Sequence, residues 1–108
     1  ISYHIMVYIF YKIRCNSVDV DSVYIGYTKH KHFARKKSFH KMKSLFETNT
    51  SKLDTAIRAH GGFKTKWTME VIESSACESL DDAKKQLPYL CEVWKADLNT
   101  VPKKAIKK

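Results

Sequence analysis

Two short runs rich in β-branched and aromatic side chains most constrain how this chain can fold. They cover residues 7–13 and 22–28, and side chains of these types favour strands. The polar residues 16–21 between them are expected to make the turn of an antiparallel hairpin. Symmetry about that turn predicts the pairs Tyr11–Tyr24, Ile13–Ser22 and Ile9–Gly26. This register puts both tyrosines on one face, whereas a slip of one residue would separate them.

The rest of the chain carries helical and strand patterns in turn. Residues 31–46 have helical spacing, and Ser51 with Asp54 resembles a capping box that begins a second helix. Alternating side chains from Trp67 to Ile72 predict a third strand.

Ser79 and Asp82 are expected to cap a last helix. Pro88 is expected to kink this helix or to begin a new one, since an interior proline costs about 3 kcal/mol.

The predicted order is ββααβα. The predicted fold class is α/β, a small three-stranded antiparallel sheet flanked by helices. The 108 residues fit a single domain over 1–108, with a basic tail at 103–108.

The chain is strongly basic. Twenty Lys and Arg against eleven Asp and Glu give a net charge of +9, which favours a polyanionic partner, because each neutralised phosphate releases condensed counterions. An anionic membrane surface and plain solubility are the rival interpretations. The apolar run at residues 3–13 is too short to cross a bilayer and contains His4 and Lys12, so no membrane-spanning segment is expected. Nucleic acid is the expected partner, and a membrane is not.

The cysteines Cys15, Cys77 and Cys91 form no CxxC pair. A disulfide framework or structural zinc site is therefore not expected, and a reducing intracellular compartment fits best.

Several motifs follow one another in a recognisable order. Residues 23–28 read Val-Tyr-Ile-Gly-Tyr-Thr, and residues 10–13 upstream read Phe-Tyr-Lys-Ile. A basic helix with Arg35 and His40 follows, and then the stretches Ala-Ile-Arg-Ala-His-Gly-Gly at 56–62, Met-Glu-Val-Ile-Glu at 69–73 and Leu-Asn at 98–99. Over about residues 7 to 104, this chain resembles the GIY-YIG nuclease family.

The resemblance implies a DNA endonuclease that hydrolyses phosphodiester bonds with a single divalent cation, Mg²⁺ or Mn²⁺, and no small-molecule cofactor. It would act inside the cell, at the DNA. Such cleavage needs an activated water and stabilisation of the developing charge. Tyr24 would be the general base, with Tyr11 as its partner. A free tyrosine has a pKa near 10, so a base role needs nearby positive charge to lower that value.

The phosphate-binding residue has two candidates. The family spaces its Arg and His four residues apart, as Lys36 and His40 are, whereas Arg35 and His40 are five apart. Arg35 is favoured because a guanidinium binds phosphate bidentately and keeps its charge. His40 would assist proton transfer.

The metal ligand is the least regular part of the resemblance. The family's glutamate precedes the Leu-Asn pair by about eleven residues, and that position holds Leu87 here. Glu92 is the expected ligand, provided that Pro88 turns the helix to bring it inward. Otherwise the chain would be a noncatalytic, GIY-YIG-like DNA-binding module. A general RNA-binding domain is a third alternative. Oligomeric state and target site do not follow from the sequence.

Overall fold

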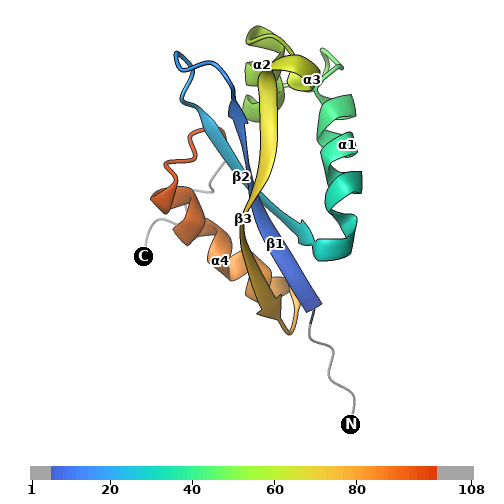
Figure 1. The fold of residues 1–108 in the computed structure, drawn as a ribbon, viewed down its shortest axis with the longest axis vertical. Helices are drawn as coiled ribbons and strands as arrows, with labels where there is room; N and C mark the ends of the chain where they lie inside the picture. Colours follow the sequence, from blue (N-terminus) through green and yellow to red (C-terminus); the bar gives the residue numbers. More distant parts are fainter. Residues whose placement is uncertain (1–5, 100–108) are drawn as a thin grey trace.

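A computed structural model describes residues 6–99, and the basic tail at 103–108 lies outside this range. The elements, in chain order, are β1 (Met6–Cys15), β2 (Val23–Lys29), the 3₁₀ helix η1 (His30–His32), α1 (Phe33–Lys43), α2 (Lys52–Ala59), α3 (Phe63–Lys66), β3 (Trp67–Cys77) and α4 (Leu80–Val93) (Figure 1). The predicted fold class and the order ββααβα are confirmed, with η1 and α3 as short additions.

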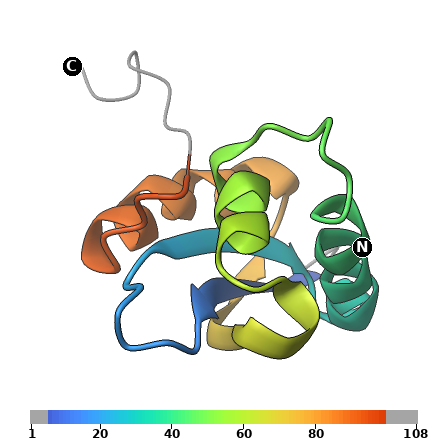
Figure 2. The ribbon, with the colours of Figure 1, turned by 90° about the horizontal axis from the view of Figure 1, so that it is seen from above.

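The three strands form one antiparallel sheet in the order β2-β1-β3. Helix α4 lies along one side of this sheet and α1 along the other, while α2 and α3 lie near one end (Figures 1 and 2). Side chains from both faces of β1 are buried. Tyr11 and Ile13 belong to the core with α2 and α3, whereas Tyr8 and Phe10 belong to the core beneath α4.

The predicted hairpin register is wrong by two residues. Tyr11 pairs with Gly26, and Ile13 pairs with Tyr24. The reason is steric, because a Cβ at residue 26 would lie 2.4 Å from Cζ and Oη of Tyr11. Only glycine leaves room for this ring. A shift of two residues preserves the face, so Tyr11 and Tyr24 still share one, as expected.

Pro88 does not begin a new helix. It lies inside α4, which runs without a break from Leu80 to Val93. Because Pro88 is exposed, the backbone carbonyl that it leaves without a partner can bond to solvent. The helix is therefore continuous across Pro88.

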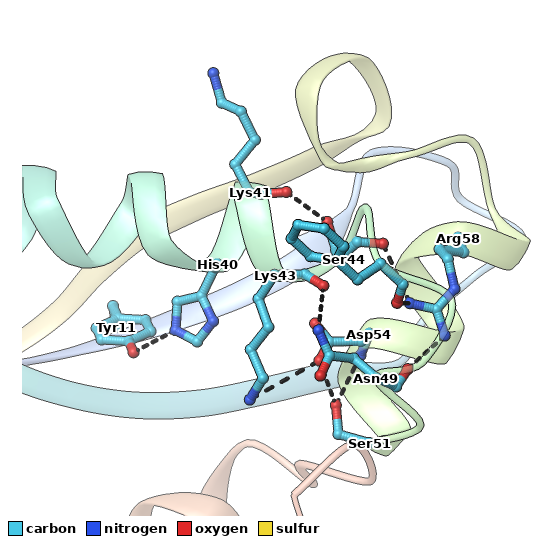
Figure 3. Close-up of polar contacts among 10 residues, drawn as sticks. Tyr11, His40, Lys41, Lys43, Ser44, Asn49, Ser51, Asp54 and Arg58 are labelled. Carbon is cyan, nitrogen blue, oxygen red and sulfur yellow. Dashed lines mark hydrogen bonds and ion pairs between the residues drawn. The ribbon is translucent and has the colours of Figure 1, made fainter.

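The connection between α1 and α2 is fixed by Arg58 of α2. Its guanidinium donates to the backbone carbonyls of Ser44, Phe46 and Asn49 (Figure 3). The Ser44 hydroxyl also donates to the Lys41 carbonyl. These bonds turn the chain after Lys43, so α1 ends three residues before the predicted end at Phe46.

The outer edge of β2 is covered by the segment that follows α4. The Asn99 side chain accepts from the Ile25 amide and donates to the Ile25 carbonyl, each at 2.7 Å. Asp97 accepts from the Val23 amide at 2.9 Å. These polar side chains take the place of a neighbouring strand and satisfy the edge.

Candidate tyrosine and histidine site

Three of the predicted site residues meet between the sheet and α1. Tyr11 Oη and His40 Nε2 share a hydrogen bond of 2.8 Å (Figure 3), and the Tyr24 ring lies edge-on to His40, with ring centroids 5.7 Å apart. Tyr11 is fully buried and His40 nearly so, while Tyr24 is half-buried. The cluster thus joins β1, β2 and α1, and Tyr24 is its most accessible member.

A hollow of about 200 Å³ opens beside these tyrosines, and we call it the tyrosine hollow. It is lined by Tyr11, Tyr24, Ile25, Gly26, Tyr27, Lys36 and Leu87. Arg35 does not line it. Arg35, which directly precedes Lys36 in α1, is exposed and lines a neighbouring hollow together with Lys36. Of the two predicted phosphate-binding candidates, the structure therefore brings Lys36 to the tyrosines.

The electrostatics of the cluster favour neutral groups. Burial raises the pKa of Tyr11 and of Tyr24 above the ordinary value. The pKa of His40 is lowered from 6.5 to about 4, mainly by burial and to a smaller extent by Lys36 and Lys43, against the opposing effect of Asp54. At neutral pH the cluster consists of two phenols and a neutral imidazole. A tyrosine that acts as general base needs a lowered pKa, whereas the pKa of Tyr24 is raised.

Glu92 is not brought to the cluster. It is exposed on α4 and does not line the tyrosine hollow. The α4 residue that reaches the tyrosines is Leu87, which has no ligand atom. Among residues 6–99, no group of three or more His, Cys, Asp and Glu is placed to hold a metal ion. The Glu92 carboxylate is therefore not among the groups that surround the tyrosines.

Asp54 is a carboxylate of this region that the sequence marked only as a helix cap. It is 1% exposed, and a second hollow, of about 310 Å³, is lined by Asp54 with Tyr24, His40 and Lys43. Its Oδ2 accepts from the Ser51 hydroxyl at 2.8 Å and lies 3.9 Å from Lys43 Nζ. The capping spacing predicted its place in α2 but carried no sign of its burial beside the histidine.

The surface next to the cluster is basic over a long stretch. No Asp or Glu occurs between Asp21 and Glu47. The same stretch contains Lys29, Lys31, Arg35, Lys36, Lys37, Lys41 and Lys43. Most of these side chains are exposed on η1 and α1, and Lys43 alone among them forms an ion pair within the described part of the chain. We call the exposed side of η1 and α1 the α1 surface; its basic residues are Lys31, Arg35, Lys36, Lys37, Lys41 and Lys43.

No helix within residues 6–99 is long and apolar enough to cross a membrane. Comparison of the chain with protein-family models, with curated proteins and with solved structures found no match.

Proposed function

We propose that this domain binds DNA, with the phosphate backbone running along the α1 surface. The observation that carries the proposal is the unbroken basic charge of this surface. Lysines and arginines without acidic neighbours attract phosphates strongly, because neutralising each phosphate releases counterions. The resemblance to the GIY-YIG family, whose members act on DNA, supports the same partner.

The tyrosine hollow would receive the backbone at one side of this surface. Lys36 lines both this hollow and the one that contains Arg35. Its ammonium would therefore bind a phosphate in either hollow. The raised pKa of Tyr24 keeps its hydroxyl protonated at neutral pH. A neutral phenol can donate a hydrogen bond to a phosphate oxygen, which is a binding role that needs no metal.

The test is a fluorescence anisotropy titration of labelled duplex DNA at several salt concentrations. Replacing Arg35 and Lys36 with alanine should weaken binding. It should also reduce the slope of log Kd against log salt concentration by the amount expected for about two lost phosphate contacts. The matched control replaces Lys84 and Lys85, two exposed lysines of α4, and should change binding far less. Equal losses in the two double variants would mean that net charge, and not the α1 surface, carries the binding.

Phosphodiester hydrolysis is the second candidate, and the hydrogen-bonded Tyr11–His40 pair beside Tyr24 favours it. The assay is nicking of supercoiled plasmid with Mg²⁺ or Mn²⁺. Nicking that Tyr24→Phe abolishes and Glu92→Gln leaves unchanged would establish an enzyme built on this cluster. Loss of nicking in Glu92→Gln would instead support Glu92 as the metal ligand that the sequence resemblance implies. DNA that is bound but uncut by the parent protein would leave the domain a binding module.

A further inference from the structure

We propose that the α1 surface binds unpaired DNA bases as well as phosphates, with Phe39 as the side chain on which a base stacks. This inference rests on the proposed DNA binding and specifies the form of DNA that the surface prefers. It is carried by large apolar side chains that stand in the middle of the basic surface.

Helix α1 and the turn after it expose an apolar stripe. Phe39 is 47% exposed, Met42 is 56% exposed and Phe46 is 54% exposed. Phe39 and Met42 are three residues apart in α1 and so lie on one side of the helix, and Phe46 follows in the turn after it. Exposed single apolar residues are ordinary, but a run of large ones on one surface is typical of a binding site. A flat aromatic ring offers a base a stacking partner whatever its sequence.

Two lysine ammonium groups lie close to the ring of Phe39. Lys36 Nζ is 5.2 Å from the ring centroid and Lys43 Nζ is 5.6 Å from it. Phe39 also lines a hollow of about 270 Å³ with Thr28, His32, Arg35 and Lys36. An aromatic platform beside Arg35 and Lys36, two cations without an ion-pair partner among the described residues, matches the alternation of base and phosphate along a single strand. In a duplex, the bases stack on one another and are closed to such a platform.

The same stripe could in principle enter a membrane interface, but the arrangement of charge argues against it. Helices that lie in a membrane interface separate an apolar face from a polar one. On α1 the two kinds of side chain are mixed, with Lys36 and Lys43 flanking Phe39 along the helix. An acyl layer that took up Phe39 would have to take up both ammonium groups or displace them. A strand of DNA uses ring and cations together.

The experiment compares a labelled single-stranded oligothymidine with a duplex of the same length by fluorescence anisotropy. The variants are Phe39→Ala, Phe39→Tyr and, as the matched control, Tyr89→Ala, which removes an exposed aromatic ring from α4. Phe39→Ala should weaken single-strand binding about tenfold, which is the scale of one lost base stack, and should change duplex binding less than twofold. Phe39→Tyr and Tyr89→Ala should leave single-strand binding near that of the parent.

The other results overturn the inference, and they differ in what they leave standing. An equal loss of single-strand and duplex binding in Phe39→Ala, or no loss in either, overturns base stacking while the proposed DNA binding stands. Binding of vesicles of phosphatidylcholine and phosphatidylserine that Phe39→Ala abolishes, without an effect on single strands, assigns the stripe to a membrane. Failure of the parent protein to bind either DNA overturns the inference and the proposed function together. Circular dichroism of each variant checks that it is folded.

Discussion

Gly26 is the residue on which the geometry of the tyrosine cluster depends. The Tyr11 ring lies where a side chain at residue 26 would begin, and the hydroxyl of the same ring reaches His40. The glycine thus fixes the hairpin register and the position of the phenol at once.

Gly26→Ala should therefore destabilise the fold, because the new methyl group and the Tyr11 ring cannot occupy the same space. Overpacking of this kind costs about 1–3 kcal/mol, measurable by urea denaturation. The control is a double-mutant cycle with Tyr11→Ala. Once the ring is removed, the methyl group fits, so the effects of the two substitutions should be far from additive. Additive effects would show that the clash does not govern residue 26.

His40 predicts a pH dependence of stability. Its pKa is about 4 in the folded protein against 6.5 for the free side chain, so between these pH values the unfolded chain binds more protons. The stabilisation is present above pH 6.5 and is lost as the pH falls toward 4, by up to about 3 kcal/mol. Urea denaturation across this range should show a weaker pH dependence for His40→Gln than for the parent. Identical profiles would contradict a buried, neutral His40.

At the scale of elements, the turn between α1 and α2 depends on one guanidinium. Arg58 binds three backbone carbonyls, and a lysine cannot donate to all three in that geometry. Arg58→Lys should cost about 2 kcal/mol and speed amide hydrogen exchange across residues 44–50. Arg14→Lys is the matched control, because its half-exposed pair with Glu70 contributes little. Unchanged exchange in Arg58→Lys would show that other contacts hold the turn.

The elements themselves follow from local sequence patterns, which is why the order ββααβα and the shared face of the two tyrosines could be predicted. The hairpin register could not, because it depends on the contact between the Tyr11 ring and Gly26, two residues that the chain brings together only on folding. The exposure of Glu92 and the inward position of Leu87 depend on the rotation of α4 about its axis, which packing decides. The burial of Asp54 and the placement of Lys36 beside the tyrosines depend on packing in the same way.

At the scale of the whole molecule, charge and chemistry lie on the same side. The stretch that forms the α1 surface contains no Asp or Glu, and the tyrosine hollow shares Lys36 with this surface. Helix α4 contributes Leu87 to the tyrosine hollow, where a metal-binding carboxylate was expected. This distribution favours a domain that holds the DNA backbone through η1 and α1.

The most direct test of that claim is a map of amide chemical shifts in the ¹H–¹⁵N spectrum as DNA is added. The account predicts that the largest changes lie in residues 29–43, with smaller changes at Tyr24 and Tyr27 around the tyrosine hollow. Amides of the exposed side of α4, around Lys84 and Lys85, should stay in place. Changes centred on α4, or a spectrum that DNA does not alter, would contradict the account.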